Sequence, residues 1–318
     1  STNKKGSEKL KVLILGNPSS FWVKEFVQYV MLPLGAKVFL KENHYSGTDY
    51  YNYYNKAGVK IIPFVPIPKW LMSIPKIRGF IMMHYQKKAL SINAPFDVII
   101  NMFVSPEELS QAVSYKQKGT RVYAYFCGSD IIRCSKLSCL RLKSCIKRID
   151  SVICASSSVQ DAYSQKIGNT INIPYITIRL GMSSFNFIKS RISEDHKSDC
   201  KKELNIDPDK ITICIGYNAN ETQNHLYVLR QLQCLPQTIL NKITVLLQMT
   251  YGGNEEYITK VENVISSVGC DYKLFREFMD MPQIARLRLS TDVFINTQAT
   301  DGLSGSVLEA LYAWGNLA

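Results

Sequence analysis

The sequence predicts an α/β protein with two doubly wound domains in tandem. Apolar runs alternate with amphipathic stretches along most of the chain, and this alternation pauses once and then restarts. Alternating strands and helices form a parallel sheet that helices cover on both faces. The pause separates a first domain at residues 1–184 from a second at residues 211–318, joined by a linker with a short helix at residues 185–210. Ligands of such sheets bind beyond the carboxyl ends of the strands, so we expect a site in a cleft between the domains.

The first domain opens with a continuous apolar run, Lys11–Gly16, which fits a strand buried on both faces. Similar runs follow at intervals that leave room for helices. The predicted strands span residues 11–16, 36–40, 59–62, 96–101, 121–126 and 151–155, and the predicted helices span residues 21–32, 106–118 and 157–166.

The second domain repeats the pattern over a shorter length. Strands are predicted at residues 211–216, 242–248 and 293–295, and helices at residues 221–233, 254–268, 281–289 and 304–314. The chain ends where another strand should follow. We therefore expect an incomplete second sheet, truncated at its C-terminus.

Composition narrows the class of protein. The apolar fraction of 46% supports full cores, and no apolar run approaches the length of about 20 residues that spans a bilayer. Nine cysteines occur without a CxxC pair, which predicts reduced thiols in the cytoplasm and neither disulfides nor a zinc site. Strand ends carry no DxD-like motif, so no metal cofactor is predicted.

The charge is uneven along the chain. Residues 1–185 carry 25 lysines and arginines against 10 acids, a net charge of +15, whereas residues 186–318 carry 13 against 16, a net charge of −3. This asymmetry predicts an anionic partner for the first domain, either nucleic acid or anionic lipid.

One basic segment has the composition of a membrane-surface element. Residues 66–88 mix large apolar side chains with Lys69, Trp70, Lys76 and Arg78, as interfacial segments do. The basic cluster at residues 133–148 adds to this case. We expect peripheral contact with the cytoplasmic face of an anionic membrane; the alternative is an amphipathic helix packed on the sheet with solvated lysines.

Two acids near the end of the chain, Asp301 and Glu309, bracket a loop of mostly small residues and a helix start. The loop consists of Gly302, Leu303, Ser304, Gly305 and Ser306. Amides at a helix start attract phosphate, and flanking carboxylates accept hydrogen bonds from sugar hydroxyls. The segment therefore predicts a nucleotide-sugar site. The alternative is an ordinary strand-to-helix connection in which Ser304 caps the helix and Glu309 is solvated.

Other strand ends supply further candidates. Gly16 ends the first strand, where a glycine also serves a tight turn, and Asp130 follows the fifth. Asp130 is the candidate base or acceptor anchor, with helix capping as the alternative. In the second domain the candidate donor-binding residues at strand ends are Asn218, Asn220, His225, Thr250, Tyr251 and Gly252. Asx-turns and caps are the alternative for the asparagines, and a structural role is the alternative for His225.

The order of these motifs resembles the GT-B glycosyltransferases, in particular the large retaining family related to glycogen and sucrose synthases. The motifs are Gly128-Ser129-Asp130, a helix that starts at Ser157, the exit Arg179-Leu180-Gly181 through Phe185, and the acid pair. The resemblance implies two Rossmann-like domains, a UDP-, GDP- or dTDP-sugar donor, Asp301 on the donor sugar and Glu309 on the ribose.

The chain also departs from that family. Asp301 stands where the family has a glutamate, and the Arg and Lys that hold the donor diphosphate after the first strand of the second domain are absent. Asn218, Asn220 and His225 occupy that stretch and are candidates to replace the cations. This stretch and residues 248–252 are similar to the bacterial 4-acetamido-4,6-dideoxygalactose transferases of enterobacterial common antigen synthesis.

The resemblance thus predicts a glycosyltransferase, hexosyl- or N-acetylhexosaminyl-transferring and retaining, that acts on a lipid-linked or glycan acceptor in bacterial surface polysaccharide synthesis. In a retaining reaction the donor phosphate takes the acceptor proton, whereas an inverting reaction would need Asp130 as base. The enzymatic alternative is a nucleotide-sugar epimerase of the same fold. A nucleic-acid-binding protein is a weaker alternative, because the chain has no aromatic-basic stacking motif.

Overall fold

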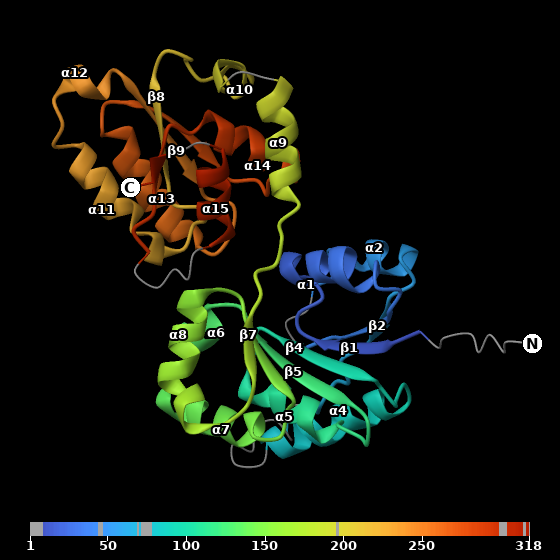
Figure 1. Ribbon diagram of the computed structural model, residues 1–318. Coiled ribbons are helices and arrows are strands. Elements are labelled where there is room, and N and C mark those ends of the chain that lie inside the picture. Colours follow the sequence, from blue (N-terminus) through green and yellow to red (C-terminus); the bar gives the residue numbers. More distant parts are fainter. Residues whose placement is uncertain are drawn as a thin grey trace, which may run out of the picture. The chain divides into compact units, whose positions relative to one another are not determined.

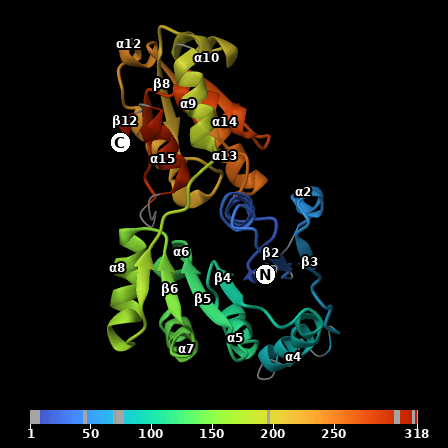
Figure 2. The same ribbon diagram turned by 45° about the vertical axis from the view of Figure 1, so that its right-hand side comes forward.

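The structure is a computed structural model that describes residues 9–43, 47–68, 70, 78–194, 197–298, 304–313 and 316–317. Of residues 78–80, 82–83, 193–194 and 316–317 it describes the backbone alone. The chain divides into two compact units, residues 1–181 and residues 182–318 (Figures 1 and 2).

Among the described residues of the first unit, seven parallel strands form one sheet in the order β3-β2-β1-β4-β5-β6-β7. They are β1 (Lys11–Leu15), β2 (Lys37–Lys41), β3 (Lys60–Ile62), β4 (Val98–Met102), β5 (Arg121–Phe126), β6 (Ser151–Cys154) and β7 (Tyr175–Thr177). The central strands β1 and β4 are almost wholly buried, as continuous apolar runs require.

Helices cover both faces of this sheet (Figure 1). One face carries α1 (Phe21–Phe26), the π-helical turn η1 (Val27–Met31) and α2 (Tyr51–Lys56), whose apolar side chains pack on Val12 and Ile14. On the other face, apolar side chains of the helices pack on Leu13 and Leu15 of β1. This face carries α4 (Arg78–Ser91), α5 (Pro106–Ser114), α7 (Lys136–Ile146) and α8 (Ser157–Lys166), and the short elements α6 (Ser129–Ile132) and η2 (Gly168–Thr170) complete the unit.

The described part of the second unit has a parallel sheet of five strands in the order β10-β9-β8-β11-β12. The strands are β8 (Ile211–Ile215), β9 (Ile243–Gln248), β10 (Asp271–Phe275), β11 (Val293–Ile295) and β12 (Asn316–Leu317). On one face lie α11 (His225–Leu232), α12 (Gln237–Leu240) and α13 (Glu255–Ser266), after the short η3 (Glu221–Gln223). On the other lie α14 (Met281–Ser290) and α15 (Gly305–Tyr312).

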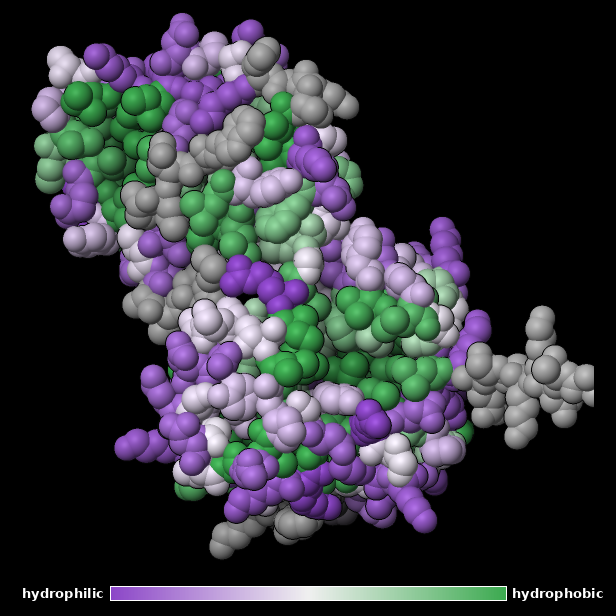
Figure 3. All heavy atoms as spheres, viewed as in Figure 1, coloured by the Kyte–Doolittle hydropathy of each residue, from purple (hydrophilic) through white to green (hydrophobic). Residues whose placement is uncertain are grey.

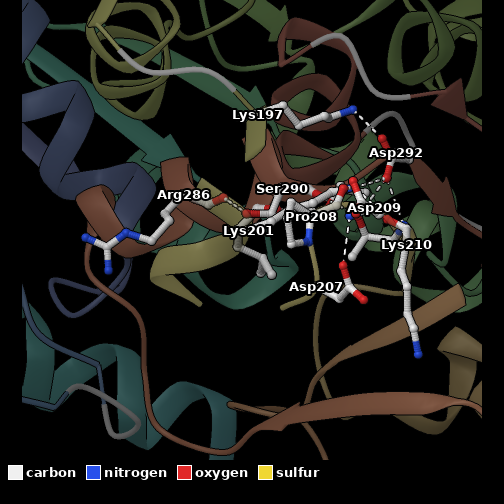
Figure 4. A network of polar contacts seen from close by, with 12 residues as sticks. Lys197, Lys201, Asp207, Pro208, Asp209, Lys210, Arg286, Ser290 and Asp292 are labelled. Atoms are coloured by element: carbon white, nitrogen blue, oxygen red, sulfur yellow. Dashed lines mark hydrogen bonds and ion pairs between the residues drawn. The ribbon is translucent and has the colours of Figure 1, made fainter. Parts of the chain in front are cut away.

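The stretch predicted as a linker, residues 185–210, contains two helices that belong to the second unit. These are α9 (Ser184–Glu194) and α10 (Lys197–Glu203). Ile188 and Cys200 are fully buried with Ala285 of α14, which explains why so polar a stretch is helical. Asp292 anchors α10, because its carboxylate contacts Lys197 Nζ at 2.7 Å and Lys201 Nζ at 2.8 Å (Figure 4).

The predicted fold class, two doubly wound α/β domains, is confirmed, and the described residues add the strands β7, β10 and the two-residue β12 to those predicted. β7 is exposed and β10 is an edge strand without a continuous apolar run, so neither gives the signal of a buried strand. The predicted helix at residues 221–233 is broken at Asn224, which has a left-handed backbone with φ 55°.

Candidate functional site

The loops that follow β8 and β9 lie against each other at the carboxyl edge of the second sheet. The amide of Ala219 donates to the carbonyl of Tyr251 at 2.7 Å. A Cβ at Gly253 would lie 2.3 Å from the Ala219 oxygen, so only glycine permits this approach. The two loops therefore form one continuous surface where parallel sheets bind ligands.

The loop after β11 joins the same surface through Gln298. Its Oε1 accepts from the Tyr217 hydroxyl at 2.7 Å and from Gln223 Nε2 at 2.5 Å. The Thr297 hydroxyl donates to the Gln223 carbonyl at 2.7 Å. Neutral hydrogen-bonding side chains that follow β8 and β11 thus converge at one place.

Beneath this surface lies a buried charged cluster that the sequence did not reveal. Arg288 of α14 is fully buried, and its Nε donates to Glu309 Oε2 at 3.2 Å. Its Nη2 donates to Gln248 Oε1 at 3.2 Å, and its guanidinium lies 5.3 Å from the centre of the Phe294 ring. Glu309 is itself buried, so the alternative of a solvated carboxylate is wrong. A buried ion pair with a third hydrogen-bonding partner holds the Glu309 carboxylate in one orientation.

The helix that carries Glu309 begins as predicted. Ser304 is the N-cap of α15 and accepts from the Val307 amide at 3.4 Å, which confirms the capping role. Gly305 and Ser306 form the first turn and are partly exposed, with their backbone amides at the helix start. Asp301, Gly302 and Leu303 lie outside the described residues.

Asn218 and Asn220 make the local contacts that the alternative interpretation predicted. Asn218 Oδ1 accepts from the Asn220 amide at 2.9 Å, and Asn220 Oδ1 accepts from the Thr222 amide at 3.0 Å. The Asn218 side chain also lies beside Tyr251 and Gly252. The asparagines therefore shape the loop that presents Tyr251 and Gly252.

His225 is uncharged in this fold. The ring is fully buried, Nδ1 lies 3.2 Å from the Tyr257 hydroxyl, and burial lowers the pKa to about 4. A positive charge on His225 near neutral pH is therefore excluded. Its Nε2 lies below the turn at Gly216, where a Cβ would approach to 2.8 Å and the backbone φ is +64°. Among the described side chains, Nε2 of His225 and the hydroxyl of Thr250 are buried without a hydrogen-bond partner.

Tyr251 lies on the surface above the charged cluster. Half of its side chain is exposed, and its ring centre lies 6.5 Å from that of Phe278, which follows β10 and is also exposed. Burial of the hydroxyl raises the pKa of Tyr251, partly offset by the side chains of Asn218 and Arg288. The two rings, tilted by 49° to each other, offer apolar surface beside the polar loops.

In the first unit, Asp130 ties two strand-end loops together. Its carboxylate accepts from the amides of Gly128 at 2.7 Å, Val104 at 2.9 Å and Cys127 at 3.0 Å. Burial raises the pKa of Asp130, and these amides partly offset the rise. Because its oxygens accept hydrogen bonds from these backbone amides, Asp130 stabilises the loops after β4 and β5.

Gly16 lies at the end of β1, where a Cβ would approach Met102 and Val23 to 3.4 Å.

Of the candidate membrane residues, Trp70 is exposed and Arg78 is the first residue of α4, while Lys69 and Lys76 lie outside the described residues. No helix within the described ranges is both long and apolar enough to cross a membrane. In the same part of the chain, no three His, Cys, Asp or Glu side chains are grouped so that they could bind a metal. All nine cysteines are free thiols.

Several solved structures have a similar fold along almost the whole length of this chain. Alr3699/HepE from Anabaena, solved with UDP and glucose, matches with a TM-score of 0.67 at 14% identity over 97% of this chain and 80% of its own. A glycosyltransferase from Rickettsia africae matches with a TM-score of 0.71 at 14% identity over 98% and 79%. Sucrose-phosphate synthase from Thermosynechococcus elongatus gives 0.70 at 11% identity over 97% and 80%.

These similarities define the class of fold, which is GT-B, and confirm the predicted resemblance at that level. No protein-family model matches the sequence, and no curated protein matches it either. The narrower resemblance to the retaining family and to the acetamido-dideoxygalactose transferases remains a prediction.

Proposed function

We propose that this protein is a glycosyltransferase that moves a sugar from a nucleotide-sugar donor to a lipid-linked or glycan acceptor. The observation that carries the proposal is the surface at the carboxyl edge of the second sheet, formed by residues 216–225, 248–254 and 297–298 and the start of α15, in a GT-B fold. The similar HepE structures contain UDP and UDP-glucose, which supports a nucleotide-sugar ligand for this surface.

In this proposal Glu309 accepts hydrogen bonds from the ribose hydroxyls, and the amides at the start of α15 bind the diphosphate. Arg288 contributes by holding Glu309, since its guanidinium is buried and contacts Glu309 and Gln248. Asp301, with Gly302 and Leu303, is assigned to the donor sugar by the resemblance alone. No metal is proposed at this site.

The reaction breaks the bond between the anomeric carbon and the diphosphate oxygen and forms a bond to the acceptor oxygen. We propose a retaining course, in which the acceptor attacks from the face that the diphosphate leaves and a donor phosphate oxygen takes the acceptor proton. The three amide contacts of Asp130 favour this course, because a carboxylate held by backbone amides is not free to turn toward an acceptor hydroxyl.

The charge of the first unit supports the biological setting that we propose. A net charge of +15 over residues 1–185 fits an acceptor carried by an anionic membrane, as in bacterial surface polysaccharide synthesis at the cytoplasmic face. The contact of Lys69, Trp70, Lys76 and Arg78 with lipid is part of the proposal.

A donor screen tests the proposal. Thermal shift against UDP-, GDP- and dTDP-sugars is expected to raise the melting temperature with one nucleotide class, and calorimetry then gives the affinity. Donor hydrolysis or transfer by the protein should follow with the same compound. The proposal fails if no nucleotide binds and no sugar is released, and an acceptor-free product inverted at C2 would instead identify an epimerase.

A further inference from the structure

Helix α7 presents two leucines to solvent on the face opposite its core residues. Cys139, Leu142 and Ile146 point into the core of the first unit. Leu137 and Leu140 are 69% and 63% exposed, among the most exposed of the large apolar side chains that the structure describes. Leu137 and Leu140 thus lie on the solvent-facing side of a helix whose opposite side packs in the core.

Basic residues lie on both sides of these leucines. At 3.6 residues per turn, Lys136 and Lys143 lie on one side of the leucines and Arg141 on the other, and Lys147 and Arg148 follow directly after the last helical residue. Residues 131–149 contain no acid, and Arg141 contacts Glu107 of α5 at 2.8 Å in a pair about half exposed to water. Exposed apolar residues flanked by cations are typical of a helix that lies in a membrane interface.

The position of α7 in the fold brings this face near the ligand edge. α5 lies between α4 and α7 on one face of the sheet, and each helix starts at the carboxyl ends of the strands (Figure 1). Leu137 and Leu140 occupy the first half of α7, so they lie toward the edge where Gly16 and Asp130 are found. Hydrophilic residues dominate this part of the surface, with hydrophobic residues among them (Figure 3).

We propose that the outward face of α7 is a docking surface for an anionic phospholipid bilayer, with Leu137 and Leu140 inserted between the headgroups. This inference rests on the proposed transfer to a lipid-linked acceptor and names the surface that brings the carboxyl edge of the first sheet to the lipid. Anionic lipid is favoured over nucleic acid because the centre of the surface is apolar and only its flanks are basic.

Co-sedimentation with vesicles tests the proposal. The wild-type chain is expected to bind vesicles of equimolar phosphatidylglycerol and phosphatidylcholine, to release on added salt, and to bind phosphatidylcholine alone weakly. Leu137→Ser with Leu140→Ser keeps every charge and should weaken binding about tenfold. Lys136→Gln with Lys147→Gln should weaken binding several-fold. Hydrogen exchange of residues 133–143 should slow on the vesicles.

The matched control is Leu235→Ser with Ile239→Ser, which removes two exposed apolar side chains from the second unit and should leave vesicle binding unchanged. Equal binding by the Leu137/Leu140 variant and the wild type overturns the proposal, as does equal affinity for neutral and anionic vesicles. Nucleotide binding is measured without vesicles on the same proteins, so loss of the donor function is separated from loss of membrane binding.

Discussion

Glu309 and Arg288 are 21 positions apart in the sequence and meet only because α14 and α15 pack on the same face of the second sheet. In the sequence, Arg288 is one of two arginines in a helix of ordinary amphipathic composition. Nothing in that pattern distinguishes Arg286, which is partly exposed, from Arg288, which is fully buried. The sequence singles out the acid of the pair as a candidate, but it gives no sign of the cation that orients it.

Replacing Glu309 with glutamine is expected to weaken nucleotide binding about 10- to 100-fold, because hydrogen bonds to a charged acceptor are worth about 1.5–3 kcal/mol. Calorimetry with UDP and with its 2′- and 3′-deoxy analogues checks this. The wild type should prefer UDP, and Glu309→Gln should lose that preference. Arg288→Lys keeps the charge but not the planar fork, so it should lose part of the preference while it still folds. Equal preference in all three proteins would exclude a ribose contact.

His225 predicts a pH dependence of stability. Its pKa of about 4 in the folded protein lies below the ordinary value of 6.5, so the unfolded chain binds the proton more readily. The stabilisation is complete above pH 6.5 and is lost as the pH falls toward 4, by about 3 kcal/mol. Denaturant unfolding at a series of pH values should show this loss in the wild type and a shallower one in His225→Gln. Identical profiles for the two proteins would show that the histidine is charged or exposed.

At the scale of single elements, the helices and strands that could be predicted are those whose own residues show a clear apolar run or helical periodicity. The continuous apolar runs of β1, β4 and β9 and the capped, periodic α13 lie close to their predicted places. β10 was missed because an edge strand needs no apolar alternation on its exposed side. α9 and α10 give the sequence pattern of a linker because their buried residues, Ile188 and Cys200, are few and are separated by a charged stretch.

The ion pairs of Asp292 with Lys197 and Lys201 are expected to stabilise the packing of α10 on the second unit. Burial alone would raise the pKa of this carboxyl, but hydrogen bonds from Lys197, Lys201 and Thr212 outweigh it and hold the pKa well below its usual range. Asp292→Asn leaves the Lys201 ammonium buried without its counterion, so we expect a loss of about 3 kcal/mol in unfolding free energy. Lys197→Gln removes an exposed partner and should cost at most about 1 kcal/mol. Similar losses for both variants, measured by denaturant unfolding, would contradict this account.

At the scale of the whole molecule, the two units differ in charge and each has its own core. Apolar side chains of the first unit pack in clusters on the two faces of its sheet, and those of the second unit do the same. The fold class was predictable because the alternation of strands and helices is repeated twice. The contacts between the loops after β8 and β11 were not predictable, since those of Gln298 with Tyr217 and Gln223 join residues about 80 positions apart.

Because the two units have separate cores, we expect a bound nucleotide to stabilise the unit that binds it more than the other unit. A ligand that binds only the folded state adds about 2.7 kcal/mol at a hundredfold excess over its Kd. UDP is therefore expected to slow hydrogen exchange in residues 216–225, 248–254 and 304–312. Residues 116–121, at the opposite edge of the first sheet, are the internal control and should exchange as before. Because the second unit has its own core, UDP should also raise the temperature of its unfolding transition more than that of the first. Protection limited to the first unit would place the nucleotide elsewhere and remove Glu309 from the site.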